Sequence, residues 1–285
     1  MRRHFVAATV TALVVGAVSC GSPPSGPSPQ PTPTPTPSNA PPVVEGITAS
    51  VARVDVDGTV TITATVRDAE TPVGQLQYTW QAEAGTFEGQ GASVTWRAPR
   101  TVSAPTNYAI SLTVTEAYGA GRQNVVPANG PTIRVHDSPR EIAELGRTFL
   151  EKFGDSRISA AMCVIDFSDA MCRDGKDKEF DDIDSNRKNF EILEYTLGQA
   201  RVSYVPGRSN GDVTIRSTFR SRIYSCRDWP PEDGPCALNT IETATFDGFM
   251  TVVYHESRWW LCTSEARPIG RVSPAMRRFF GSTRR

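Results

Sequence analysis

The chain has 285 residues, of which 39% are hydrophobic and 21% charged, with 30 Lys and Arg side chains against 31 Asp and Glu. This balance is typical of a globular protein and leaves no basic excess to neutralise phosphates, so nucleic acid is not an expected partner. The length beyond the first forty residues predicts two compact domains.

Residues 1–19 predict a cleaved export signal. Arg2 and Arg3 supply positive charge, and the apolar run from Phe5 to Val18 is too short to cross a membrane as a helix. The residues that follow this run, Ala17-Val18-Ser19-Cys20, resemble the lipobox of bacterial lipoproteins. That resemblance implies cleavage before Cys20, lipidation of this cysteine and anchoring to a membrane of the bacterial cell envelope.

An ordinary secretory signal, which would leave Cys20 as a free thiol, is the alternative for this segment. In either case the exported chain loses Arg2 and Arg3, so 28 basic residues remain against 31 acidic ones, a net charge of −3. Residues 21 to 40 contain eight prolines, mixed with Ser and Thr, and have almost nothing apolar to bury. We therefore expect residues 20–41 to form an extended, Pro/Thr-rich stalk that has no fold of its own.

Residues 42–136 carry the period-two pattern of strands with one buried face. Apolar side chains alternate with Thr from Thr59 to Val66, and Gly-containing turns separate seven or so such runs. The motifs Tyr78-Thr79-Trp80, Val94-Thr95-Trp96 and the run from Tyr108 to Thr115 resemble bacterial immunoglobulin-like modules of the polycystic kidney disease (PKD) type. The resemblance implies an all-β sandwich packed around Trp80, and a role as a spacer or as a binder of proteins or glycans.

Residues 138–266 predict an α+β domain. Ser138-Pro139-Arg140-Glu141 is a capping box, and helical spacing of apolar residues predicts a helix over 139–153. Strands are then predicted at 195–205, 213–226, 241–255 and 259–264. The sequence thus favours a two-domain fold in which an immunoglobulin-like sandwich is followed by helices packed on a curved antiparallel sheet. A basic tail over 267–285, frayed or in contact with anionic lipid, would follow.

The order of elements in the second domain resembles the nuclear transport factor 2-like family. The resemblance rests on the final hairpin, which contains Arg258-Trp259-Trp260-Leu261-Cys262, and on the piece from Glu179 to Ile192. It implies a cone-like domain that either binds a ligand or partner or, as in isomerases and cyclases of the family, uses a carboxylate base and a tyrosine. The local candidates for those catalytic roles would be Asp166, Tyr204, Tyr224 and Tyr254.

Other candidate sites have simpler explanations. The alternation of one strand places three arginines on the same face, which would suit an anionic ligand if that face were concave and is a solvated face otherwise; they are Arg216, Arg220 and Arg222. His255 is expected at an exposed turn. Four acidic residues could in principle build a calcium site, namely Asp55, Asp57, Asp68 and Glu70. A hairpin turn at Asp57 and a loop at Asp68 are the expected explanation instead. We predict no metal and no cofactor.

The remaining cysteines predict disulfides, because an exported chain meets oxidising conditions. Cys226 and Cys236 flank a Pro-rich loop and form the predicted pair. One further pair is expected, of undetermined connectivity, among Cys163, Cys172 and Cys262.

Three hypotheses for function follow. The first is a non-catalytic, lipid-anchored envelope protein that displays a β-sandwich and a ligand- or partner-binding domain. The second is a small enzyme of the isomerase or cyclase kind in the C-terminal domain. The third is a surface adhesin or glycan binder that acts through the first domain. No nucleophile elbow, zinc-protease motif or phosphate-binding glycine loop occurs in the sequence, which favours the first hypothesis.

Overall fold

The computed structural model describes residues 39–154, 190–223 and 238–280, all of which belong to one compact unit, Asn39–Arg285. This part of the chain is mostly β, with 61% strand, 13% helix and three four-stranded sheets. The predicted fold class, an immunoglobulin-like sandwich followed by an α+β domain of helices packed on a curved antiparallel sheet, is therefore wrong. The physical reason lies in the C-terminal half, where strands of 12 to 15 residues dominate and helical periodicity is confined to short stretches.

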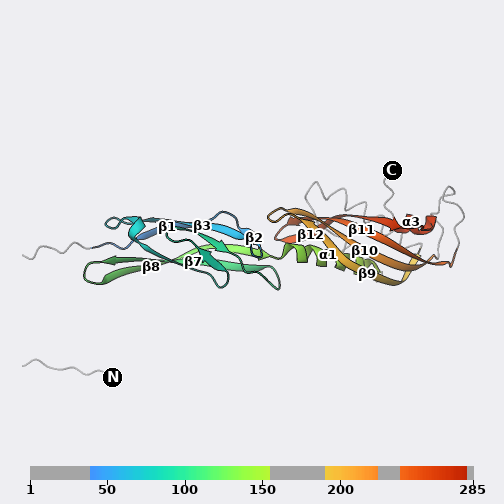
Figure 1. The fold of residues 1–285 in the computed structure, drawn as a ribbon, viewed down its shortest axis with the longest axis horizontal. Helices are drawn as coiled ribbons and strands as arrows, with labels where there is room; N and C mark the ends of the chain where they lie inside the picture. The colour runs from blue at the N-terminus through green and yellow to red at the C-terminus, as the bar shows by residue number, and fades with distance from the viewer. Residues whose placement is uncertain (1–38, 155–189, 224–237, 281–285) are drawn as a thin grey trace, which may run out of the picture. The chain divides into compact units, whose positions relative to one another are not determined.

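Two of the sheets form the N-terminal region, and they lie as two layers in Figure 1. The first has the order β1-β3-β6-β5, with bounds Val43–Ala49, Thr59–Arg67, Ser93–Arg97 and Thr86–Glu88. The second has the order β2-β8-β7-β4, with bounds Arg53–Asp55, Arg122–His136, Thr106–Tyr118 and Gln77–Gln81. A short 3-10 turn, η1, covers Val73–Gln75. We call these two sheets the β-sandwich because a shared core fills the space between them.

The core of the β-sandwich follows from the alternation in the sequence. In β3, Val60, Ile62 and Ala64 are buried while the threonines between them are exposed, as the period-two pattern predicts. The central aromatic residue, however, is Trp96, which is 0% exposed and packs on Tyr108 of the opposite sheet. Trp80, expected in that role, lies on the edge strand β4 and is only partly buried.

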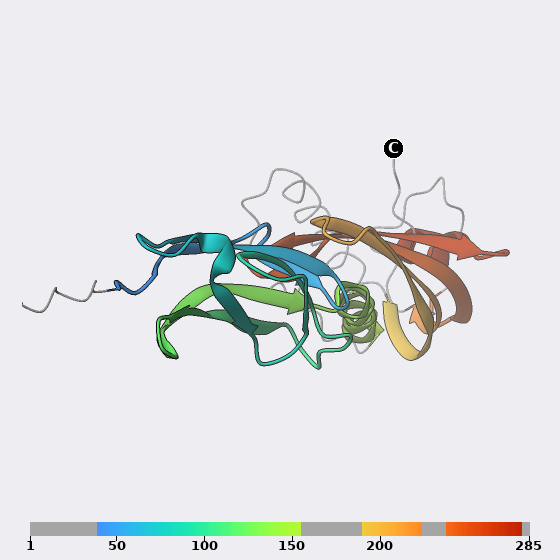
Figure 2. The same ribbon diagram turned by 60° about the vertical axis from the view of Figure 1, so that its left-hand side comes forward.

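The third sheet forms the C-terminal region as an antiparallel meander of order β12-β11-β10-β9. Its strands are β9 (Phe190–Tyr204), β10 (Asn210–Ile223), β11 (Ile241–His255) and β12 (Arg258–Ile269). Helix α1 (Ser138–Gly154) covers one face of it, as Figure 2 shows. Ile142 and Leu150 of the helix pack in one cluster with sheet residues that include Val213 and Met250.

Helix α1 matches its predicted range, but its N-terminal cap differs from the prediction. The side chain of Asp137, not that of Ser138, accepts a hydrogen bond from the backbone N–H of Arg140, at 3.3 Å. Glu141 closes the cap by accepting from the backbone N–H of Asp137 at 3.0 Å. Because Asp137 satisfies the free N–H group of the first turn, the Ser138 hydroxyl remains available for a contact outside the helix.

The predicted basic tail is also ordered over most of its length. β12 continues to Ile269, with Arg267 opposite Asp247 of β11. Helix α3 (Pro274–Phe280) follows, and it buries Ala275 and Met276 in the cluster around Phe219 and Phe246. The apolar residues between the arginines thus hold this segment on the sheet, and a frayed end from residue 267 onward is not found. Neither of the described helices is both long and apolar enough to span a membrane.

Candidate functional site

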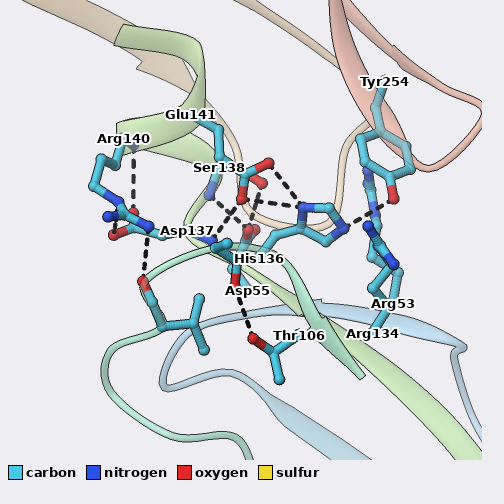
Figure 3. A network of polar contacts seen from close by, with 12 residues as sticks. Arg53, Asp55, Thr106, Arg134, His136, Asp137, Ser138, Arg140, Glu141 and Tyr254 are labelled. Carbon is cyan, nitrogen blue, oxygen red and sulfur yellow. Dashed lines mark hydrogen bonds and ion pairs between the residues drawn. The ribbon is translucent and has the colours of Figure 1, made fainter. Parts of the chain in front are cut away.

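A partly buried polar cluster joins the β-sandwich to α1 and to the C-terminal sheet (Figure 3, in which Tyr204 is not labelled). We call it the junction network, and its members come from β2, the end of β8, the start of α1 and the ends of β9 and β11. They are Arg53, Asp55, His136, Ser138, Glu141, Tyr204 and Tyr254. The network is therefore built from segments up to about 200 positions apart in the chain, which only the tertiary fold brings together.

His136 is the most deeply buried member, with 0% of its surface exposed. Its Nδ1 lies 2.9 Å from the Glu141 carboxylate, and its Nε2 lies 2.9 Å from the Tyr254 hydroxyl. Because a carboxylate only accepts, Nδ1 carries the proton, and in the neutral ring Nε2 accepts from the tyrosine. A protonated ring would donate to both partners, so His136 stays fully hydrogen-bonded in either state.

Asp55 forms the second branch of the network. One carboxylate oxygen accepts from the Ser138 hydroxyl and from the Ser138 backbone N–H. The other accepts from the Tyr204 hydroxyl at 2.7 Å, and this hydroxyl in turn accepts from the backbone N–H of Gly207 at 3.0 Å. Burial raises the pKa of Tyr204, and the bond to the Asp55 carboxylate raises it further. Tyr204 is thus held as a neutral hydroxyl that donates to a carboxylate.

Arg53 reaches from β2 into the C-terminal region. Its Nη2 donates to the backbone carbonyl of Arg208 at 2.8 Å, and its guanidinium carbon lies 3.8 Å from the ring centroid of Tyr254. The Tyr204 and Tyr254 rings meet Trp259 edge-on, with centroids 5.4 Å and 5.5 Å from the Trp259 ring. Cation–π and edge-to-face contacts of this kind add to the hydrogen bonds and fix the position of β2 against β11.

Among the described residues, three buried donors in or beside the network have no hydrogen-bond partner: Arg53 Nη1, Arg134 Nε and Trp259 Nε1. Each such group costs free energy when it is taken out of water. The network is otherwise satisfied, since each hydroxyl, carboxylate and imidazole nitrogen described above already has a protein partner. The network therefore holds the β-sandwich, α1 and the C-terminal sheet together, because its protons are shared between fixed protein groups.

The predicted catalytic residues divide into two groups. Tyr204 and Tyr254 both lie in the junction network, bonded to Asp55 and His136. Asp166 and Tyr224 lie outside the described residues. The carboxylate that meets Tyr204 is Asp55, and the predicted pairing of Asp166 with a tyrosine falls outside the described residues.

The three arginines proposed for an anionic ligand are exposed on the face of β10 opposite α1. Arg216 makes a two-pronged contact with the Asp247 carboxylate at 2.9 Å and 3.0 Å, and this pairing lowers the pKa of Asp247. Arg222 lies 3.7 Å from Glu191, and Arg220 is exposed between them. This face of the sheet is solvated and carries local ion pairs.

The cysteines are mostly beyond the described residues. Cys262 is described; it is 3% exposed and disulfide-bonded. The other five cysteines, Cys20, Cys163, Cys172, Cys226 and Cys236, lie outside the described ranges. The Cys226–Cys236 disulfide, the identity of the Cys262 partner and the lipidation of Cys20 therefore stay predictions.

The residues weighed for metal binding have structural roles. Asp55 belongs to the junction network, Asp57 adopts a positive φ of 59° in a turn, and Asp68 accepts from the backbone N–H groups of Glu70 and Thr71. His255 lies next to the hairpin turn at Glu256 and Ser257. Within residues 39–154, 190–223 and 238–280, no group of three or more His, Cys, Asp or Glu side chains could hold a metal ion.

A second buried polar cluster lies where the described chain begins, and we call it the Glu116 cluster. Glu116 of β7 is 0% exposed and accepts from Thr71 at 2.5 Å, from Asn39 at 2.7 Å and from Asn124 at 2.9 Å. The Thr71 bond is the main reason why the pKa of Glu116 lies below its usual value, against the opposing effect of burial. The cluster ties Asn39, four positions ahead of β1, to the loop at Thr71 and to the paired strands β7 and β8.

Sequence reasoning missed Arg53, His136 and Glu141 as a set. His136 was noticed only as one of two histidines that remain after export, and Glu141 only as a helix cap. The one local signal was the unusual density of polar side chains between β8 and α1, in His136-Asp137-Ser138. Comparison of the chain with protein-family models and with curated proteins gives no match.

Proposed function

We propose that this protein is a non-catalytic, lipid-anchored component of the bacterial cell envelope, held at the membrane through Cys20 and a Pro/Thr-rich stalk. In this proposal the β-sandwich is a stiff spacer, and the C-terminal sheet with α1 is the part that meets a protein partner or ligand. The observation that carries the proposal is the junction network, because it uses the described catalytic candidates to join the two regions.

The chemistry of Tyr204 and Tyr254 supports a structural role. A tyrosine that acts as a catalytic acid must deliver its proton to a substrate, yet the Tyr204 proton is directed at Asp55 and burial raises its pKa. Tyr254 is bonded to a histidine that is 0% exposed. Hydrogen bonds to charged groups stabilise by about 1.5–3 kcal/mol and neutral ones by about 1 kcal/mol, so the two tyrosines together make a sizeable contribution to coupling.

The test is calorimetry on the mature protein and on a Tyr204→Phe/Tyr254→Phe double variant. If the network couples the two regions, the wild-type β-sandwich and C-terminal sheet unfold in one cooperative transition, and the double variant unfolds in two. Tyr118→Phe is the control, since Tyr118 lies at the tip of the β7–β8 hairpin, opposite Arg122 and far along the strands from His136. A double variant that keeps a single transition at the wild-type temperature would contradict the proposal.

A further inference from the structure

A solvent-open hollow of about 560 Å³ lies on the β-sandwich, where β4 ends and the chain crosses to β5. Trp80 and Phe87, which come from the two different sheets, line it with stacked rings whose centroids are 6.3 Å apart. Both rings are partly exposed. The hollow thus has an aromatic wall at a place where the edges of two sheets meet.

Hydrogen bonds to backbone carbonyls fix the walls of the hollow. Trp80 Nε1 donates to the backbone carbonyl of Gly91 at 3.0 Å, which sets the ring orientation. Trp96 Nε1 donates to the carbonyl of Ala84 at 3.1 Å and holds the crossing segment from below. Gly85 has a φ of +87°, and a Cβ there would lie 2.6 Å from Trp96 Nε1, so the crossing can pass this close only as glycine.

Apart from two alanines and a glycine, the remaining lining is polar and nearly uncharged. Gln81 and Thr86 offer an amide and a hydroxyl, the Ser111 hydroxyl donates to the Gln81 backbone carbonyl at 3.5 Å, and Glu83 is the one ionisable side chain of the lining. A negatively charged ligand would be repelled by Glu83 and would find no cation among these residues. A ligand with many hydroxyls and one apolar C–H face fits better, because the rings can pack on that face while the amide, carboxylate and hydroxyls bond to the rim.

We propose that this hollow binds a neutral oligosaccharide, with Trp80 and Phe87 packing on a sugar ring and Gln81 and Glu83 bonding to its hydroxyls. The inference goes beyond the proposed role as an anchored spacer and does not depend on it, because the hollow belongs to the β-sandwich alone. It assigns the first region of the protein a ligand of its own.

The test is isothermal titration calorimetry on the full mature chain with three trisaccharides. We expect binding of at least one of two neutral ones, tri-N-acetylchitotriose and maltotriose, and no binding of the anionic trigalacturonic acid. Gln81→Ala should weaken binding about five-fold, as the loss of one hydrogen bond predicts. Gln77→Ala is the matched control on the same strand, because Gln77 is exposed on β4 and lies outside the hollow.

Glu83→Gln provides a second surface variant that preserves the fold. It should weaken neutral-sugar binding several-fold, because a charge-assisted hydrogen bond becomes a neutral one, and it should remove the discrimination against trigalacturonic acid. The proposal is overturned if neither neutral trisaccharide binds at millimolar concentration, or if Gln81→Ala binds as tightly as Gln77→Ala.

Discussion

Glu116 shows how one residue can hold the first described segment of the chain. Its carboxylate accepts from Asn39, which lies four positions ahead of the edge strand β1. Among the described strands, β1 pairs only with β3, and its register is irregular between Val44 and Gly46, so backbone pairing alone holds it weakly. A buried, charge-assisted bond ahead of this strand is therefore well placed to resist peeling from the N-terminal side.

The Glu116→Gln variant tests this role through its pH dependence. The folded-state pKa of Glu116 is lowered, so its carboxylate contributes stability that is present above the unfolded-state pKa and is lost as the pH falls through the folded-state pKa. We expect Glu116→Gln to lower the melting temperature at neutral pH, with the difference from wild type shrinking under acidic conditions.

Glu45→Gln is the control for that experiment. Glu45 is an exposed carboxylate that lies 2.7 Å from Arg67 between β1 and β3, and exposed ion pairs contribute about 0–1 kcal/mol. Its loss should change the melting temperature little at any pH. An equal effect of the two variants, or a Glu116→Gln effect that is independent of pH, would contradict a special role for Glu116.

At the scale of elements, the sequence predicted those structures whose signal is local. The helix over 139–153 and the strand over 241–255 were both found where predicted, because apolar periodicity and turn residues fix them within a short window. The sequence predicted Ser138 as the N-terminal cap of α1, whereas Asp137 takes this role, since both residues can cap a helix. Only the contact of Ser138 with Asp55, 83 positions earlier, decides between them.

The predicted fold class was wrong for a related reason. The sequence predicted the individual strands, but the balance between sheet and helix depends on how far each strand extends. β12 continues past Ser264 through Pro268 because it pairs with β11 there. The same pairing, with the burial of Met276, turned the expected frayed tail into an ordered segment. Long-range pairing of this kind overrides the local signals of charge and proline.

The candidate site was predicted only in part. Tyr204 and Tyr254 were singled out because tyrosines on strands can serve in catalysis, but their actual partners come from the β-sandwich. No spacing rule connects Asp55 with Tyr204 or His136 with Tyr254. A polar network between two regions is visible only when the regions are in contact.

At the scale of the whole molecule, the proposal depends on anchoring through Cys20. We expect the mass of the mature N-terminus to show a lipidated cysteine, and the protein to partition with membranes. Cys20→Ala should abolish both the added mass and the membrane partition. Cys262 serves as an internal reference for a cysteine without lipid, because it is disulfide-bonded. An unmodified Cys20, or unchanged partition of the variant, would contradict lipid anchoring.

The central claim is that the junction network makes the β-sandwich and the C-terminal sheet move as one body. Residual dipolar couplings measure this directly, because amides in one rigid body share a single alignment tensor. The account predicts one tensor for the amides of β1–β8 and of β9–β12 in the wild-type protein, and two tensors in the Tyr204→Phe/Tyr254→Phe variant. Two different tensors in the wild-type protein would contradict it.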